Sequence, residues 1–587
     1  MAPLASPRRL LALVAMAAVL GLVAGGVAFV LIRFIALLTN LALLHRVGWE
    51  LPSFAHFHPG ISVVAAAVAG GLVVSLLARW SPIIRGHGLP EAMESVLERQ
   101  SRIAPRTALA KPLSAAVAIG TGGPFGAEGP IIVTGGALGS LLGQVVTVSP
   151  SERKILLASG AAAGMAATFG APLAAVVLAI ELLLFEFSKR AFLPLVVAAS
   201  VAAGVHSAIF GTGPLFTIAH HPFTGLDKLP LYVFLGMACG LLAAVLTKGL
   251  FAVERAYRRL PVHEFWHPAI GALIFGCIGV LVPRVLGVGY DAISDVLAGK
   301  LALGTLAVLM VAKLVAWWFA LGSGTSGGTL APILLVGGAY GAALGEIVDR
   351  IIPGAHLAPG AFALAAMAAT FGASTGATFA SIVFLFELTR DYDAILPLMI
   401  AAVAADLVAR ALLRDDNLMT EKLSRRGLRV PSDYHADSLR TTAVREVMTS
   451  DVVTLPDVAT MADAARRFRS GGHGAYPVVD ATGACVGIIA RGDLLRDADD
   501  ASIQTAASLD VVSVGPSATV LDALELMLEE SVDHLPVIDG GRLVGICTRG
   551  DVLAARGRQF AAEHAQAGWR PQRRARTARQ VPGDADR

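Results

Sequence analysis

The chain has 587 residues, which is too long for one compact core, so we expect at least two domains. Hydrophobic residues make up 55% of the chain and charged residues only 16%, and the mean hydropathy is +0.67. Soluble proteins carry about 25% charged residues, so this composition excludes a wholly soluble protein. The net charge is only +3, and the charges are unevenly distributed along the chain. We expect no nucleic-acid partner.

The first predicted element is the apolar run from Leu10 to Val30, directly after Arg8 and Arg9. A signal peptide also begins with a basic flank, but this run exceeds about 20 residues and further apolar spans follow it. We therefore favour a retained membrane helix. The two arginines predict a cytoplasmic N-terminus, and we expect the protein in the inner or plasma membrane.

Apolar spans continue to about residue 427, where we place the end of a membrane domain, 1–427. Five of them are Ile61–Leu77, Val196–Ile209, Leu231–Leu246, Ala269–Val282 and Leu303–Leu321. Several are shorter than the roughly 20 residues that cross a bilayer, and other runs are broken by Gly-Pro or Gly-Gly. Short, interrupted helices are tolerated at membrane depth only where they are buried or line a polar cavity. The pattern predicts a transport site.

The membrane domain contains an internal repeat. Residues 129–143 match residues 331–345, and residues 165–171 match residues 367–373, both with a spacing of 202 positions. After residue 373 the second copy gains four residues, and Glu181 then aligns with Glu387. A transporter built from two such halves places its site where their interrupted helices meet. The spacing leaves open whether the halves run parallel or inverted.

One asymmetry separates the two copies, because Glu128 in the first aligns with Leu330 in the second. Glu128 follows a Gly-rich loop and precedes Pro130 at the start of a predicted helix. Such a loop and helix start direct unpaired backbone N–H groups at one point and form an anion site. A carboxylate can occupy this site until a proton or an anion displaces it. The alternative is a plain capping carboxylate, but an ionisable residue at membrane depth is costly and usually functional.

Four other acids have weaker signals. Glu91 and Glu94 follow the turn Gly86–Pro90 and fit a capped helix as well as an ion site. Glu181 and Glu387 occupy equivalent positions in the two copies. This symmetry favours a structural role, with the carboxylates bonding backbone groups, over a proton path.

From about residue 428 the composition becomes that of a soluble α/β module. After a linker, 428–443, the pattern at residues 476–493 recurs at residues 535–551. In both copies a Pro-Val pair is followed by an Asp, then by a predicted strand, and then by Arg-Gly-Asp. We predict two copies of one domain, 444–500 and 501–556. Residues 557–587 are rich in arginine with little apolar pattern and are predicted to be a disordered basic tail near anionic lipid.

The four cysteines, Cys239, Cys277, Cys485 and Cys547, lie far apart without a CxxC pair. Neither a disulfide framework nor a metal site is expected, and we interpret the cysteines as small buried hydrophobes. The sequence shows no nucleophile–base pair and no Walker loop, so we expect no enzyme.

The membrane half resembles the CLC chloride channel and transporter family over about residues 10–425. Three family signatures occur in order: Gly-Ser-Gly-Ile-Pro at Gly86–Pro90, Gly-Arg/Lys-Glu-Gly-Pro at Gly126–Pro130, and Gly-x-Phe-x-Pro at Gly328–Pro332. The resemblance implies an all-α polytopic membrane domain of two inverted repeats, and a homodimer with one pore per subunit. It also implies chloride or a similar small anion as the substrate and Glu128 as the external gate.

The resemblance further implies a set of anion-binding positions, several of which depart from the family pattern. They are His87, Gly88, Gly126, Ala127, Gly129, Thr329, Leu330 and Met419. His87 replaces a serine that helps to hold the anion, and its imidazole would donate a hydrogen bond or alter the anion preference. Ala127 replaces a basic neighbour of the gate, Leu330 a phenylalanine, and Met419 a pore-lining tyrosine.

Leu182 falls where proton-coupled members of the family carry their inner proton-transfer glutamate. An apolar side chain cannot relay a proton, so we expect a voltage- or pH-gated channel. The alternative is a Cl⁻/H⁺ antiporter with another proton route, through Glu181 or Glu186.

The C-terminal repeat resembles a pair of CBS domains over about residues 444–556. Such domains often bind adenine nucleotides, with the Asp of a Thr/Ser-x-x-Asp motif on the ribose hydroxyls. Thr548 and Asp551 match this motif, whereas Ala490 lacks the hydroxyl before Asp493. The resemblance implies ATP, ADP or AMP as a ligand of a cytoplasmic regulatory pair, with no cofactor required for transport. A purely structural dimerisation module is the alternative.

Two hypotheses from other classes are less consistent with the sequence. A CBS-regulated divalent-cation channel would need a carboxylate-lined pore, and this membrane half offers one conspicuous loop carboxylate. A membrane-anchored nucleotide sensor would need no interrupted helices in the bilayer.

Overall fold

The structure of the chain, a computed structural model, forms two compact units, Met1–Tyr434 and His435–Arg587, which are described one at a time. The described residues are 7–146, 148–218, 228–352, 359–413, 416–426, 439, 442–495, 501–503, 507 and 511–566. The predicted linker, 428–443, lies almost entirely outside them.

The first unit is built of helices. Among its described residues, eight helices are long and apolar enough to cross a membrane: α1 (Pro7–Leu44), α2 (Ser62–Trp80), α8 (Lys189–Phe210), α9 (Leu229–Arg259), α10 (His267–Leu281) with the turn before it, α12 (Leu303–Gly322), α13 (Leu330–Ile351) and α16 (Ile395–Leu413). The other helices are α3 (Leu89–Glu98), α4 (Pro105–Gly120), α5 (Glu128–Val145), α6 (Pro150–Phe169), α7 (Pro172–Ala179), α11 (Tyr290–Leu297), α14 (Pro359–Thr375), α15 (Thr378–Thr389) and α17 (Glu421–Ser424). Each apolar span predicted from the sequence lies, to within one residue at its ends, in one of the eight long helices.

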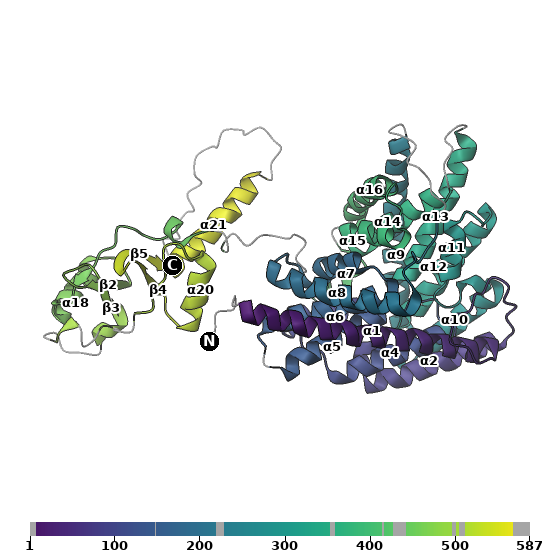
Figure 1. Cartoon of the computed structure of the whole chain (residues 1–587), viewed down its shortest axis with the longest axis horizontal. Coiled ribbons are helices and arrows are strands. Elements are labelled where there is room, and N and C mark those ends of the chain that lie inside the picture. The colour runs from purple at the N-terminus through teal and green to yellow at the C-terminus, as the bar shows by residue number, and fades with distance from the viewer. Residues whose placement is uncertain are drawn as a thin grey trace, which may run out of the picture. The chain divides into compact units, whose positions relative to one another are not determined.

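Equivalent residues of the two repeats face each other across a local twofold axis. The N–H of Gly328 donates to the carbonyl of Gly126 at 2.9 Å, and the N–H of Gly126 donates to the carbonyl of Gly328 at 3.3 Å. This antiparallel exchange between residues 202 positions apart is consistent with the inverted repeats that the family resemblance implies. Copy one extends from α3 to the turn after α7, and copy two from α11 to α15. In Figure 1 the purple-to-blue helices α1, α2, α4 and α5 lie along one side of this unit, and the green helices α14–α16 lie along the other.

Small residues allow the helices to approach closely. Helix α5 crosses α6 at Gly135 and Gly160, where a Cβ on either glycine would lie 2.1 Å from the carbonyl oxygen of the other. Large apolar side chains such as Leu11, Leu241 and Leu407 are exposed instead. Close glycine crossings with apolar outer faces are the arrangement expected of helices in lipid.

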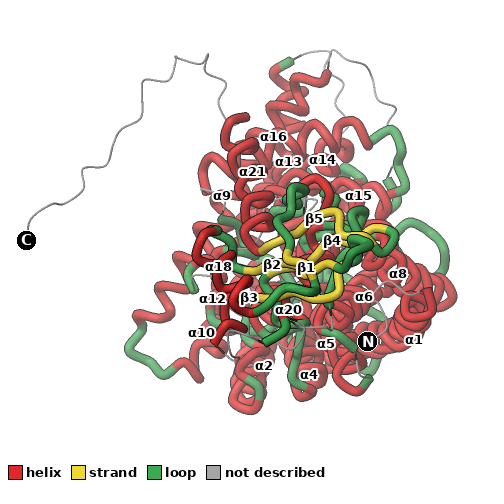
Figure 2. Tube along the Cα trace, turned by 90° about the vertical axis from the view of Figure 1, so that its left-hand side faces the viewer, coloured by secondary structure: helices red, strands yellow, loops and turns green. Residues whose placement is uncertain are grey.

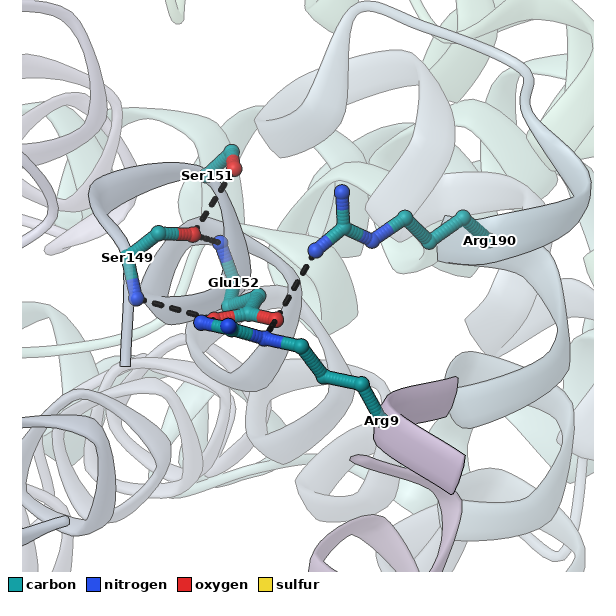
Figure 3. A network of polar contacts seen from close by, with 5 residues as sticks. All are labelled: Arg9, Ser149, Ser151, Glu152 and Arg190. Carbon is teal, nitrogen blue, oxygen red and sulfur yellow. Dashed lines mark hydrogen bonds and ion pairs between the residues drawn. The ribbon is translucent and has the colours of Figure 1, made fainter. Parts of the chain in front are cut away.

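A buried carboxylate ties three helices together at one face of this unit (Figure 3). Glu152 is 1% exposed and accepts hydrogen bonds from Arg9 Nη2 at 2.7 Å and from Arg190 Nη2 at 2.8 Å. Ser149 caps α6 by exchanging bonds with Glu152. The starts of α1, α6 and α8 therefore lie at the same face.

The second unit contains two small sheets with helices packed against them. Its elements are β1 (Leu455–Pro456), α18 (Met461–Ser470), β2 (Ala475–Val479), β3 (Cys485–Ala490), η8 (Arg491–Leu495), α20 (Val520–Glu529), β4 (His534–Asp539), β5 (Arg542–Thr548) and α21 (Arg549–Gln566). Strand β2 pairs with β1 in parallel and with β3 antiparallel, and β4 pairs antiparallel with β5. A bridge between Ala484 and Arg542 joins the two sheets, whose strands lie side by side in Figure 2.

Two sequence-based expectations differ from the structure. The predicted disordered tail is helical from residue 557 to Gln566, because this stretch is rich in helix formers such as Ala, Arg, Gln and Glu. Residues 567–587 lie outside the described part. Cys239 and Cys547 are buried, but Cys485 is only partly buried and Cys277 is exposed, on a face of α10 that also exposes Leu273 and Leu281.

Candidate functional site

Three glycine-rich loops meet in the first unit. In addition to the Gly126–Gly328 exchange, Gly86 forms a bridge with Ser326. A Cβ on Gly129 would lie 2.8 Å from the carbonyl oxygen of His87. The three predicted motifs are therefore in contact. Helices α5 and α13 both begin here, so the unpaired N–H groups of two helix starts face the same region and favour an anion.

Two buried lysines hold the loops that precede α3 and α11. Nζ of Lys111 donates to two carbonyls of the turn that ends at Gly86, at 2.8 and 2.6 Å. Nζ of Lys313, 202 positions later, donates to two carbonyls of the turn that ends at Gly287, both at 2.9 Å. Both lysines are 0% exposed. Each copy thus fixes its loop by the same device, a buried lysine that donates to two backbone carbonyls.

Glu128 lies buried between these helix starts, with 1% of its surface exposed. Its Oε1 accepts a hydrogen bond from the hydroxyl of Tyr290 at 2.7 Å. The backbone N–H groups of Glu128 itself and Ala331 also attract the carboxylate. Its Oε2 accepts no regular hydrogen bond from a described residue, and a Cβ on Gly126 would lie only 1.6 Å from this oxygen. The carboxylate therefore fills the space in which an anion would meet the amide groups.

The predicted anion-site residue His87 lies beside this region. Its ring is buried and hydrogen-bonded to the backbone of Leu418, and its Nδ1 has no partner among the described residues. Met419, in the same turn as Leu418, is also buried. Gly88 has a φ of +91°, and a side chain there would collide with Val133.

The remaining predicted positions form the two helix starts. Ala127 and Thr329 are the N-cap residues of α5 and α13, while Gly129 and Leu330 lie in the first turns. The structure thus brings together the anion-site positions expected from all three motifs, and the turn at 418–419 joins them through His87.

Leu182, expected at the inner proton position, lies in the turn Ile180–Leu184 after α7. It lines a cavity of about 10 Å³ together with Leu89, Ile132 and Met165, and no side chain around this cavity is polar. The cavity could hold about one water but offers it no side-chain hydrogen bond. Glu186 is half-buried, and its Oε2 lies 4.0 Å from Nζ of Lys154.

Glu181 and Glu387 bond to each other's half of the fold in a reciprocal manner. Glu181 accepts from the N–H groups of Phe379 and Ala380 at the start of α15, at 3.3 and 2.9 Å. Glu387 accepts from the equivalent N–H groups at the start of α7, at 3.1 and 2.7 Å. This symmetric capping agrees with the predicted backbone role. The other pair of acids behaves differently, since Glu94 forms ion pairs with Arg99 and Arg426, while Glu91 Oε2 has no described partner.

Sequence reasoning missed Tyr290, Lys111 and Lys313. The lysines carried a signal, because they are spaced by the same 202 positions as the recognised repeat. Tyr290 could have been found by aligning Gly287-Val-Gly-Tyr290 with Gly86-His-Gly-Leu89, which is shifted by one residue from that spacing.

In the second unit, the predicted nucleotide-binding Asp551 lies in the first turn of α21 and forms a capping box with Thr548. Its Oδ2 accepts from Thr548 Oγ1 at 2.8 Å and from the Thr548 N–H at 2.9 Å, while no described residue bonds Oδ1. Asp493 makes only the backbone bond, from the N–H of Ala490 at 2.8 Å. Burial lowers the pKa of His534 at the start of β4, although Asp551 lies close enough to oppose this shift.

Two family models match the chain. The model described as voltage gated chloride channel matches residues 69–410, and the CBS domain model matches residues 444–500 and 503–558. CBS domains commonly bind adenine nucleotides.

Curated relatives include the H(+)/Cl(-) exchange transporter ClcA of Vibrio campbellii, which is 31% identical over 414 residues, covering 68% of this chain and 86% of that protein. Another is the chloride channel protein CLC-f of Arabidopsis thaliana, 28% identical over 82% of this chain and 71% of that protein.

Solved structures share the fold. A slow cyanobacterial Cl⁻/H⁺ antiporter has a TM-score of 0.63 at 25% identity and covers 72% of this chain and 98% of its own. A eukaryotic CLC transporter has a TM-score of 0.60 at 22% identity, covering 93% of this chain and 99% of its own. Since the family model matches more than half of the sequence, the chain belongs to the voltage-gated chloride channel (CLC) family of multi-pass membrane transporters and channels, with two CBS domains at its C-terminal end.

Proposed function

We propose that this protein exchanges chloride, or a similar small anion, for protons across a membrane, with Glu128 as the gate. The observation that carries the proposal is the position of the Glu128 carboxylate, which is buried between two helix starts, bonded by Tyr290 and attracted by Lys313. A carboxylate in this position imitates a bound anion. It leaves when a proton neutralises it or when an anion competes for the amide groups.

Exchange is better supported than the channel that Leu182 led us to expect. The curated relatives include H(+)/Cl(-) exchange transporters, and the Glu128 carboxylate lies so close to Gly126 that even a Cβ there would be 1.6 Å from its Oε2. A gate that must take up a proton before an anion can pass links the two ions. Because Leu182 offers no proton acceptor, the inner part of the proton route would rely on water in the anion pathway rather than on a side chain.

The anion would bind to the N–H groups at the starts of α5 and α13, around Ala127, Gly129, Thr329 and Leu330. His87 would bind the anion through Nδ1 only with a protonated ring, because the N–H of the other ring nitrogen donates to the backbone of Leu418 and Nδ1 of the neutral ring carries a lone pair. Gly88 and Gly126 would keep side chains out of the anion's space, and Met419 would close the site on the side of the turn at Leu418.

The test is simultaneous recording of chloride and proton movement in liposomes that contain the purified full-length protein. Exchange predicts that a chloride gradient drives protons uphill with a fixed ratio of the two ions. Chloride movement without proton movement would show that the protein is a channel and not an exchanger. If neither ion moves in active, correctly folded preparations, the proposal fails.

The CBS pair would face the cytoplasm and regulate transport by binding ATP, ADP or AMP. Support comes from Asp551, whose Oδ1 has no described partner and could accept the two ribose hydroxyls while Oδ2 caps α21. Asp493 would contribute less, because Ala490 offers no hydroxyl. A nucleotide that shifts neither the melting temperature nor the transport rate of the full protein would favour a purely structural role.

The protein would form a homodimer through the short helices α7 and α15. Their equivalent residues Leu173 and Phe379 are 51% and 59% exposed, on helices too short to cross a bilayer. Light scattering of the detergent-solubilised protein checks this, and a monomer would contradict it.

A further inference from the structure

The hydroxyl of Tyr290 is the one side-chain group that bonds the Glu128 carboxylate within the described part of the chain. Tyr290 is the first residue of α11 in copy two, and Glu128 is the first residue of α5 in copy one. The equivalent position to Tyr290 in copy one is Leu89, and the equivalent of Glu128 in copy two is Leu330. One pair across the twofold axis is therefore a donor and an acceptor, while the other pair is apolar.

The backbone that carries Tyr290 is fixed on several sides. Lys313 holds the turn that ends at Gly287, whose own N–H donates to the carbonyl of Gly122 at 3.2 Å. Asp291, the residue after Tyr290, accepts a hydrogen bond from Ser53 Oγ at 2.6 Å. With the turn and the helix start both anchored, the tyrosine has little freedom to move away from the carboxylate.

The ring of Tyr290 is also constrained. It packs edge-on against Phe169 at 6.4 Å and against Phe216 at 6.2 Å between ring centroids. A cavity of about 30 Å³ beside it is lined mainly by apolar side chains, including Ile35 and Val288. Since few polar groups compete for the hydroxyl there, its bond to the carboxylate is stronger than a solvent-exposed one.

Three other titratable or charged groups lie near this pair. Lys313 on α12 attracts both Glu128 and Asp291, and His87 lies on the loop before α3. None of the three donates a hydrogen bond to Glu128 among the described contacts. The tyrosine hydroxyl is thus the group whose loss would change the carboxylate's bonding most directly.

We infer that Tyr290 is a positioning residue that latches the ionised Glu128 carboxylate in the anion site. The inference rests on the proposed exchange function. An ionised carboxylate accepts the hydroxyl well, whereas a protonated one is a weaker acceptor, so the latch holds the gate closed until a proton arrives. An incoming anion must compete with the latched carboxylate for the same amide groups.

The test is Tyr290→Phe in the full-length protein in liposomes. A hydrogen bond to a charged group contributes enough free energy that its loss should change the equilibrium between the bound and the released Glu128 carboxylate about tenfold. Chloride transport at neutral pH should rise, and the pH of half-maximal transport should move up by about one unit. The chloride concentration for half-maximal transport should fall. The matched control is Tyr257→Phe, because the Tyr257 hydroxyl has no partner among the described residues.

A double variant separates a latch from a structural effect. If Tyr290 acts through Glu128, then Tyr290→Phe should leave the chloride flux of Glu128→Ala unchanged. Tyr290 replaced site-specifically by a fluorinated tyrosine, whose hydroxyl is a stronger donor, should move the pH midpoint down. An unchanged midpoint in Tyr290→Phe, or an equal change in flux with and without Glu128, would overturn the latch. If the unmodified protein shows exchange, either result leaves the proposed function intact.

Discussion

The two copies of the membrane repeat use the same scaffold for different purposes. Each fixes its first loop with a buried lysine, Lys111 or Lys313, and each caps the other's short helix with a glutamate. The copies differ where the helix starts meet. Copy one supplies the carboxylate of Glu128 and copy two supplies the hydroxyl of Tyr290. Duplication thus provides a symmetric site rich in amide groups, and two side chains make that site asymmetric.

The largest expected effect comes from replacing Glu128, whose carboxylate makes the site asymmetric. Glu128→Ala should abolish proton movement and reduce the pH dependence of chloride flux at least about tenfold, because the titratable group in the site is gone. The matched control is Leu330→Ala at the equivalent position, which should keep the pH dependence. The measurement is chloride flux in liposomes across a pH series. An unchanged pH dependence in Glu128→Ala would show that Glu128 is not the gate.

Gly126→Ala should act through the same carboxylate. The new Cβ would lie 1.6 Å from Glu128 Oε2, and its three nearest heavy atoms all belong to that carboxylate. Glu128 must then leave the site, so coupling of protons to chloride should weaken several-fold. In a Glu128→Ala background the same substitution should have little effect on flux. A similar loss in both backgrounds would show that Gly126 is needed for the backbone exchange instead.

The two lysines allow the copies to be compared by matched substitutions. Lys313→Met should change the pH profile, because it removes a charge near Glu128 and releases the turn before Tyr290. Lys111→Met should instead change the chloride concentration needed for half-maximal transport, because it releases the turn before His87. Each variant leaves two carbonyls without their donor, so a loss of about 1–3 kcal/mol in stability is expected from both. Identical transport changes in the two variants would contradict the division of roles.

Glu181→Ala and Glu387→Ala should give equal and smaller effects. Each removes the acceptor for two backbone N–H groups at a helix start, which should cost about 1–2 kcal/mol of stability. Melting temperatures of the two variants in detergent check the equality. Loss of proton coupling in Glu181→Ala alone would identify Glu181 as part of a proton route.

The smallest effect extends the comparison to the CBS pair. Thr548→Ala should weaken the cap of α21 by about 1 kcal/mol, because Thr548 Oγ1 no longer accepts from the backbone N–H of Asp551. The reverse change, Ala490→Thr, should add the missing hydroxyl beside Asp493 in the first copy. Nucleotide titration of the full protein followed by its melting temperature compares the two variants. Equal nucleotide affinity in the unmodified protein and in both variants would exclude a role for the hydroxyl.

Much of the architecture could be predicted from local features of the sequence. Apolar length and glycine interruptions indicated membrane helices, and the spacing of 202 positions indicated a duplicated fold with Glu128 as its point of difference. These signals are linear, because hydropathy and repeats depend on neighbours along the chain. The helix that continues to Gln566 was missed because a high arginine content outweighed its helix propensity in our interpretation.

Only the tertiary structure shows which residues act on Glu128. Tyr290 lies 162 positions away and is brought to the carboxylate by the twofold arrangement of the repeats, which no local pattern contains. The reciprocal bonds of Glu181 and Glu387 likewise join segments about 200 positions apart. Hydropathy and the repeat spacing specify the helices, the duplication and the carboxylate at their meeting point. The fold decided the donors around that carboxylate, because hydrogen bonds depend on distances in space and not on spacing along the chain.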